Sequence, residues 1–352
     1  MEKRESYFDN AKILLIFLVV FGHFIQSYID ANVFISYMYN FIYTFHMPAF
    51  IIISGFFAKG IYEKGYIWKI TKKLIVPYML FQVLYAVFYY FLHEEKTFHL
   101  ELLDPRWSLW FLISLFFWNI LLLMFNKLKP AAALAIAITI GLAAGFADWI
   151  TNYLSLSRTL VFFPFFLVGY FLNKDSFQKL SSKKAKATAA AVMLVVTVGI
   201  IYFPDLNEKW FFGSMPYGDL ESEKFLGMLK RTGIYAIQFI MAGSFFAFVP
   251  RRRFFFTRWG KNTLYVYLLH GFIVRLFRGS SLEDYLNQTL TLPVLIFASF
   301  VLTALLSSKY VTSLTQPFIE LRISKWKPFI QAIEIKRMQN AGTFMDHIDN
   351  RK

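Results

Sequence analysis

The chain has 352 residues, of which 57% are hydrophobic and 20% aromatic, whereas only 17% are charged, against about 25% in soluble domains. This composition excludes a disordered chain, a secreted disulfide scaffold and an ordinary cytosolic enzyme. The absence of cysteine excludes disulfides, thiolate nucleophiles and cysteine-ligated metal sites. The net charge of +15 is distributed in short clusters between apolar runs, which favours a membrane protein over a nucleic-acid binder.

Ten apolar segments approach the length of about 20 residues that a membrane-spanning helix needs. They are residues 10–29, 34–58, 74–92, 107–126, 130–147, 159–173, 187–203, 230–249, 262–278 and 288–311. The first segment carries Lys12 and His23 and has no small-residue cleavage pattern, so we expect a retained helix rather than a secretory signal. The sequence therefore predicts an all-α polytopic membrane bundle of about ten helices.

Basic residues between the segments predict the orientation of this bundle. With the N-terminus in the cytoplasm, 27 of the 37 Lys and Arg residues fall on the inner side and nine on the outer side, while Lys12 lies inside the first span. Because cytoplasmic loops of membrane proteins carry an excess of Lys and Arg, we expect both termini in the cytoplasm. Residues 1–312 form the expected transmembrane domain, and 313–352 a basic cytoplasmic tail.

The first predicted span carries two ionisable side chains, which are costly in lipid and are therefore functional candidates. Lys12 and His23 are eleven residues apart, close to three helical turns, so they share one face of the helix at about 16 Å along its axis. The structural alternative for Lys12 is that its ammonium extends to the inner headgroups or pairs with Asp9. His23 could equally make a structural interhelical hydrogen bond.

The second predicted span carries His46 at mid-depth, followed closely by Pro48. Proline removes a backbone donor and frees carbonyl groups at this level. His23 and His46 at similar depth on neighbouring antiparallel helices favour a site that handles protons. A kinked helix in which His46 only caps freed backbone groups is the structural alternative.

Further candidates lie at the ends of later spans. Arg106 and Trp110 open the fourth span, where an interfacial aromatic belt with an arginine anchor is the structural alternative. Arg158 opens the sixth span and is either an anchor or a contact for an anionic or sugar group. Asn262 begins the ninth span and His270 lies within it. Because no carboxylate or thiolate lies near the histidines in the membrane, we expect no metal site.

Taken together, these motifs resemble the membrane-bound acyltransferase 3 family, in the branch of fucose 4-O-acetylase-like proteins and intercellular-adhesin O-acyltransferases. The resemblance rests on five ordered motifs: Asp-Asn-Ala-Lys12 with His23, Phe-His46-Met-Pro with Ser-Gly-Phe, Trp-Phe-Leu in span four, Arg158 before Phe-Pro-Phe-Phe, and Asn262-Thr-Leu-Tyr with Leu-Leu-His270. It covers residues 9–275. Two departures are the lysine where much of the family has arginine, and the absence of a fused esterase-like domain.

The resemblance implies O-acylation, most often acetylation, of a cell-envelope or extracellular carbohydrate by cytoplasmic acyl-CoA. His23 and His46 are then the expected catalytic residues, with His23 as general base, and Lys12 the expected acyl-CoA contact. Arg158, Arg106, Trp110, Asn262 and His270 are expected to bind the acceptor or support the site. Acyl-CoA is a co-substrate, and no cofactor is expected to be bound permanently. The expected location is the plasma membrane of a bacterium.

Two other classes of protein fit the same residues. A transporter or flippase that exports a glycan or its precursor also uses about ten helices around a polar site, but typically shows inverted repeats, and none is recognisable here. A non-catalytic membrane sensor or assembly partner would tolerate alanine at both His23 and His46. Neither the acceptor nor the acyl chain length can be read from the sequence.

Overall fold

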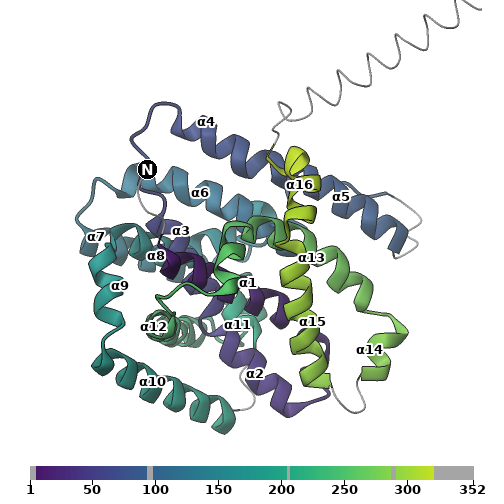
Figure 1. Ribbon diagram of the computed structural model, residues 1–352. Coiled ribbons are helices and arrows are strands. Elements are labelled where there is room, and N and C mark those ends of the chain that lie inside the picture. Colours follow the sequence, from purple (N-terminus) through teal and green to yellow (C-terminus); the bar gives the residue numbers. More distant parts are fainter. Residues whose placement is uncertain (1–4, 93–97, 204–206, 287–290, 321–352) are drawn as a thin grey trace, which may run out of the picture. The chain divides into compact units, whose positions relative to one another are not determined.

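The computed structural model describes residues 5–92, 98–203, 207–286 and 291–320, and within these ranges it is helical and contains no strand (Figure 1). Helices of the first half are α1 (Ser6–Ile25), η1 (Gln26–Tyr28), α2 (Val33–Tyr43), α3 (His46–Phe56), α4 (Tyr66–Ile70), the π-helical η2 (Thr71–Ile75), α5 (Val76–Leu92), η3 (Trp107–Leu109), α6 (Trp110–Phe125), α7 (Pro130–Ala144), η4 (Tyr153–Ser155) and α8 (Leu156–Phe171).

Helices of the second half are α9 (Lys174–Leu180), α10 (Lys183–Tyr202), α11 (Lys209–Phe212), η5 (Tyr217–Asp219), α12 (Lys224–Phe248), η6 (Phe255–Lys261), α13 (Thr263–Phe277), α14 (Ser281–Leu286), α15 (Thr291–Leu306) and α16 (Lys309–Ile319). Residues 1–308 form one compact unit and residues from Lys309 onward a second. The predicted tail, 313–352, lies outside the described residues from position 321 on.

Several of these helices can cross a membrane. Among the described residues, five helical stretches have the necessary length and apolar composition: Ser6–Tyr28, Tyr66–Leu92, Trp107–Phe125, Tyr153–Phe171 and Lys183–Tyr202. Within the described ranges all ten predicted segments fall on helices, while residues 288–290 of the last segment lie outside those ranges. The all-α class is confirmed, and the chain has the character of a helical membrane protein. The count of ten crossings and the cytoplasmic location of both termini stay predictions.

The second predicted span differs most from its expected form, because it is two helices rather than one. The chain leaves the helical conformation at Phe45, where φ is −138° and ψ is −26°, between α2 and α3. In an unbroken helix the ring of Pro48 would clash with the carbonyl of Thr44, four residues earlier. The break removes that clash and places Pro48 in the first turn of α3, where no backbone donor is needed.

Helices α3 and α8 cross at close range through two glycines. A β-carbon on Gly55 would overlap the carbonyl oxygen of Phe166, and one on Gly169 would overlap that of Ile52. Small residues allow membrane helices to approach backbone to backbone, where van der Waals packing holds them together. This crossing fixes α3, and with it His46, against α8, which carries Arg158.

Helix α1 packs against α3, α13, α15 and η6, and thus connects the parts that carry the candidate residues. Asn10 is fully buried and its amide group donates to the carbonyls of Pro250 (2.8 Å) and Arg252 (2.9 Å). Its side-chain oxygen accepts from the Thr257 hydroxyl at 2.6 Å. The segment leading into η6 is therefore tied to the first turns of α1.

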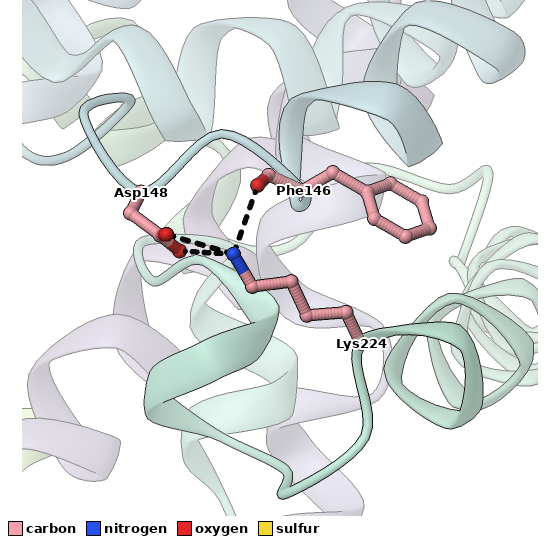
Figure 2. A network of polar contacts seen from close by, with 3 residues as sticks. All are labelled: Phe146, Asp148 and Lys224. Atoms are coloured by element: carbon pink, nitrogen blue, oxygen red, sulfur yellow. Dashed lines mark hydrogen bonds and ion pairs between the residues drawn. The ribbon is translucent and has the colours of Figure 1, made fainter.

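The loops at the other end of the bundle are tied by an exposed ion pair (Figure 2). The Lys224 ammonium at the start of α12 lies 2.7 Å and 2.9 Å from the two Asp148 carboxylate oxygens and 3.3 Å from the Phe146 carbonyl. Exposed pairs contribute at most about 1 kcal/mol. More of the order here comes from Tyr217, which is fully buried and donates to the Leu142 carbonyl at 2.9 Å.

Candidate active site

His23 lies where two adjoining cavities meet. The first, called here the polar cavity, has a volume of about 150 Å³ and is lined by Val19, His23, Gln26, Tyr43, His46, Met47, Trp107, Ser108, Trp110, Arg158, Phe162, Phe211 and Phe212. It brings together four of the residues expected from the sequence: His23, His46, Trp110 and Arg158. These residues belong to α1, α3, α6 and α8.

The second cavity, called here the apolar cavity, has a volume of about 180 Å³ and runs toward η2 and the start of α13, which are predicted to lie near the cytoplasmic side. It is lined by Ile16, Val19, His23, Met47, Phe50, Ser54, Lys73, Leu74, Ser108, Trp110, Phe111, Leu112, Leu115, Thr263, Leu264 and Tyr267. Five residues line both cavities: Val19, His23, Met47, Ser108 and Trp110. The two spaces are therefore adjacent at His23.

The imidazole of His23 belongs to an aromatic cluster with Trp107 and His270. The centroid of its ring lies 4.6 Å from that of Trp107 and 5.5 Å from that of His270, with the two histidine rings nearly parallel. The Trp107 and His270 rings are 5.2 Å apart. The Nδ1 atom of His23 is buried and has no hydrogen-bond partner among the described residues.

Trp107 adopts an unusual backbone conformation at this cluster, with φ at +47°. Such a conformation is strained for a residue other than glycine and is maintained only by its surroundings. Gly271 on α13 makes room for it, because a β-carbon there would overlap the Trp107 ring and the Tyr85 hydroxyl. Arg275 stacks on the indole at 5.3 Å. Tight packing therefore places the Trp107 ring against His23.

His46 and His270 make matching hydrogen bonds within their own chain segments. Nδ1 of His46 lies 2.9 Å from the Ile42 carbonyl, and Nδ1 of His270 lies 2.9 Å from the Val266 carbonyl. Because a carbonyl oxygen only accepts, Nδ1 carries the proton in both rings, and Nε2 of a neutral ring is then the acceptor. The Ile42 carbonyl also accepts from the Phe45 backbone at 3.2 Å, so the His46 imidazole is a second donor to a carbonyl at the break after α2.

Arg158 stands at the end of the polar cavity away from the apolar one. Its guanidinium lies 5.0 Å over the Trp110 ring and donates to Asn152 Oδ1 at 3.1 Å and to the Phe212 carbonyl at 3.3 Å. Phe212 belongs to α11, in the long segment between α10 and α12. The arrangement leaves a cation and an aromatic face directed at the cavity, a combination suited to a sugar or an anion.

The remaining sequence candidates lie outside both cavities. Arg106 donates from its backbone to Gln82 Oε1 at 3.0 Å and from its side chain to the His99 carbonyl at 2.6 Å. In the same segment, burial and then nearby Glu101 raise the pKa of the Asp104 carboxyl above its usual value. Asn262 donates to the Ser307 carbonyl at 2.8 Å, joining α13 to the end of α15.

Lys12 also lies outside the two cavities. Its ammonium is 3.1 Å from the Asp9 carboxylate and 5.3 Å from the centroid of the Phe57 ring. The pairing with Asp9 that the sequence allowed is therefore present. Its proposed contact with acyl-CoA is untested by this geometry.

Sequence reasoning missed three contributors to the site. Trp107 stands at the end of a predicted span, where a tryptophan is ordinarily interfacial. Ser108 and Tyr43 carry no signal of their own, although Tyr43 lies three residues before His46 and so shares its region of the helix break. Among the described residues, no group of three His, Asp or Glu side chains is placed to hold a metal ion.

Comparison with known proteins identifies the family of the chain. Residues 5–308 match the model of a family described as an acyltransferase domain. Because the match spans most of the chain, the protein belongs to this family, the acyltransferase 3 family that its motifs resemble, and is an acyltransferase.

Two relatives carry the name nodulation protein NolL. The chain is 28% identical over 301 residues to that of Sinorhizobium fredii (strain NBRC 101917 / NGR234), covering 78% of this chain and 79% of the relative. It is 26% identical over 296 residues to that of Mesorhizobium japonicum (strain LMG 29417 / CECT 9101 / MAFF 303099), covering 78% and 77%. No solved structure matches the chain.

Proposed function

We propose that this acyltransferase is an integral protein of a bacterial plasma membrane that moves an acetyl group from cytoplasmic acyl-CoA to a hydroxyl of a cell-envelope or extracellular carbohydrate. The observation that supports this best is the position of His23 between the two cavities. A donor and an acceptor that occupied one cavity each would meet at its imidazole. An exporter of glycans would have no comparable need for a base at that point.

The two cavities suit two different substrates. The apolar cavity runs from His23 toward Lys73 and Thr263, and its narrow apolar walls match an extended acyl-pantetheine arm. The polar cavity contains Arg158 over Trp110, and stacking on an aromatic face with charge-assisted hydrogen bonds is a common way of binding a sugar. The donor therefore approaches from the side predicted to be cytoplasmic, and the acceptor from the opposite side.

Acyl transfer at His23 needs no covalent intermediate on the protein. A nitrogen of the neutral imidazole takes the proton of the acceptor hydroxyl while the hydroxyl oxygen attacks the thioester carbonyl carbon. The new C–O bond forms, the C–S bond breaks, and the imidazolium returns the proton to the departing CoA sulfur. General-base assistance of this kind contributes about 10²–10⁴-fold to the rate.

The neighbours of His23 have supporting roles in this reaction. Trp107 and His270 confine its ring on two sides, which holds the base in one orientation. Arg278 donates to the His23 carbonyl and to Gln26 Oε1, fixing the backbone at the same residue. His46 lines the polar cavity with Nε2 as its acceptor atom and orients the acceptor hydroxyl.

Mass spectrometry of surface glycans tests this function. A deletion strain and the same strain carrying the wild-type gene are compared for O-acyl groups and for the total amount of exported glycan. We expect the gene to restore an ester mark whose mass increment identifies the acyl group, at unchanged glycan yield. An unchanged acylation pattern with altered yield would instead identify an exporter.

A further inference from the structure

A third cavity lies at the end of α1 remote from the polar cavity and is strongly basic. It has a volume of about 130 Å³ and is lined by Ser6, Asp9, Arg253, Thr257, Arg258 and Lys261. Its three cations are exposed, and none of them forms an ion pair with a described carboxylate. Asp9, the one acidic residue of the lining, is paired with Lys12. This cavity, called here the basic pocket, therefore has the charge that suits an anion.

The basic pocket is built rather than being a chance collection of surface charges. Its Thr257 hydroxyl donates to Asn10 Oδ1 at 2.6 Å and accepts from the Phe254 backbone at 2.8 Å. Gly260 packs so closely on α1 that a β-carbon would overlap the Asp9 carbonyl. Together with the two hydrogen bonds from the Asn10 amide group, these contacts hold Arg253, Arg258 and Lys261 beside the helix.

One face of α1 connects this pocket to the candidate active site. Asp9, Lys12, Ile16, Val19 and His23 follow each other at spacings of three and four residues, which places them in a single stripe. Asp9 lines the basic pocket, Ile16 and Val19 line the apolar cavity, and His23 lies at its end. Fourteen residues separate Asp9 from His23, which is about 21 Å of helix.

The dimensions of CoA match this stripe. Roughly thirteen bonds lie between its sulfur and the first phosphorus of the pyrophosphate, an extended length of about 16 Å at ~1.2 Å per bond. With the sulfur at His23, the pyrophosphate reaches the level of Lys12, about 16 Å away along the helix axis. The ribose 3′-phosphate, which lies farther from the sulfur, then falls at the level of the basic pocket.

We propose that Arg253, Arg258 and Lys261 bind the 3′-phosphate of acyl-CoA. This inference rests on the proposed function, because it takes acyl-CoA as the donor. Arginine suits the role through two parallel hydrogen bonds to phosphate oxygens, and lysine adds a point charge. The headgroup phosphate of an anionic lipid has the same chemistry, and the experiment below separates the two sources.

Donor selectivity tests this pocket directly. The full-length protein is placed in nanodiscs of phosphatidylcholine, and kcat/KM is measured for acetyl-CoA and for acetyl-3′-dephospho-CoA. We expect the kcat/KM of the wild type to be about tenfold or more higher for acetyl-CoA. This is the effect of one or two hydrogen bonds to a charged group, which the dephospho donor cannot make. We expect the triple variant R253A/R258A/K261A to lower this preference to about one. Because both donors are measured with the same preparation, the ratio of their kcat/KM values does not depend on the fraction of protein that is folded.

A matched control removes three exposed lysines on the same predicted side of the membrane: K127A/K129A/K186A. It should keep the wild-type preference, and so should the wild type in nanodiscs that contain phosphatidylglycerol. A wild type that does not discriminate between the two donors, or a pocket variant that keeps the preference, would overturn the proposal. If the anionic lipid instead abolishes the preference, the pocket is a lipid site.

Failure of the proposed function would be separable from failure of the pocket. A wild type that transferred no acetyl group from either donor would contradict the function. Binding of 3′,5′-ADP by calorimetry would then decide about the pocket: we expect the wild type to bind and R253A/R258A/K261A to lose binding by tenfold or more. Equal binding by both proteins would overturn the assignment.

Discussion

The tautomer of His46 follows from its partner, because Nδ1 lies 2.9 Å from a carbonyl that only accepts. The ring therefore has two separable roles. Nδ1–H donates to the carbonyl at the end of α2, and Nε2 can accept a hydrogen bond in the polar cavity. His270 repeats this arrangement with Val266, and its Nε2 is buried without a partner among the described residues. At the scale of single residues, His46 and His270 are therefore imidazoles whose Nδ1–H is already used within the protein.

Replacement of His46 by asparagine separates these two roles. The asparagine amide places a donor where Nδ1 lies but has nothing at the position of Nε2. We expect His46→Asn to keep the thermal unfolding midpoint of the wild type and to lower kcat by about 10²-fold. His46→Ala should lower both quantities. Wild-type kcat in the asparagine variant would show that His46 only caps the helix end.

The position of Trp107 depends on Gly271. A β-carbon at residue 271 would overlap the indole ring and the Tyr85 hydroxyl, so Gly271→Ala should displace Trp107 from His23. Because small displacements at a catalytic group cost about 10²-fold in rate, we expect kcat to fall by that order. Gly243→Ala on α12, where nothing lies within 4 Å, is the control and should keep full activity. Equal rates for the two variants would contradict the packing role.

At the scale of elements, the close crossing of α3 and α8 holds His46 and Arg158 in one cavity. Gly55→Ala would drive a methyl group into the carbonyl of Phe166, and overpacking of this kind costs about 1–3 kcal/mol. We expect the midpoint of thermal unfolding in detergent to fall accordingly. Gly199→Ala on α10 meets nothing within 4 Å and should leave the midpoint unchanged or slightly higher. A stable Gly55→Ala variant would show that the helices separate easily.

How far the elements and site can be predicted depends on the kind of signal. The helices and the intramembrane histidines are readable, because long apolar runs and ionisable residues within them are locally conspicuous. The break at Phe45 is readable in part, since Pro48 indicates a disturbance of the helix but not its place three residues earlier. Trp107 and the basic pocket are not readable, because each depends on contacts between segments distant in the chain, such as Trp107 with Gly271 and Asn10 with Thr257.

At the scale of the whole molecule, the assignment of one cavity to the donor and the other to the acceptor requires a single orientation of the bundle in the membrane. The chain contains no cysteine, so single cysteines introduced at exposed positions report topology without background. Tyr62 and Tyr285 are comparably exposed, at 77% and 74%, and are predicted to lie on opposite sides. We expect a membrane-impermeant maleimide to label Tyr285→Cys in intact cells and Tyr62→Cys only after permeabilisation. The reverse pattern would invert the donor and acceptor sides.

The central claim is that His23 transfers an acyl group between substrates that meet from opposite sides. The most direct measurement supplies ¹³C-labelled acetyl-CoA to the predicted cytoplasmic face of the purified protein in vesicles. Labelled ester on a glycan acceptor at the other face is then followed by mass spectrometry. We predict transfer by the wild type and by His99→Ala, an exposed histidine in the loop between α5 and α6, and a rate lower by about 10²–10⁴-fold for His23→Ala. Transfer at the wild-type rate by a folded His23→Ala variant would contradict the account.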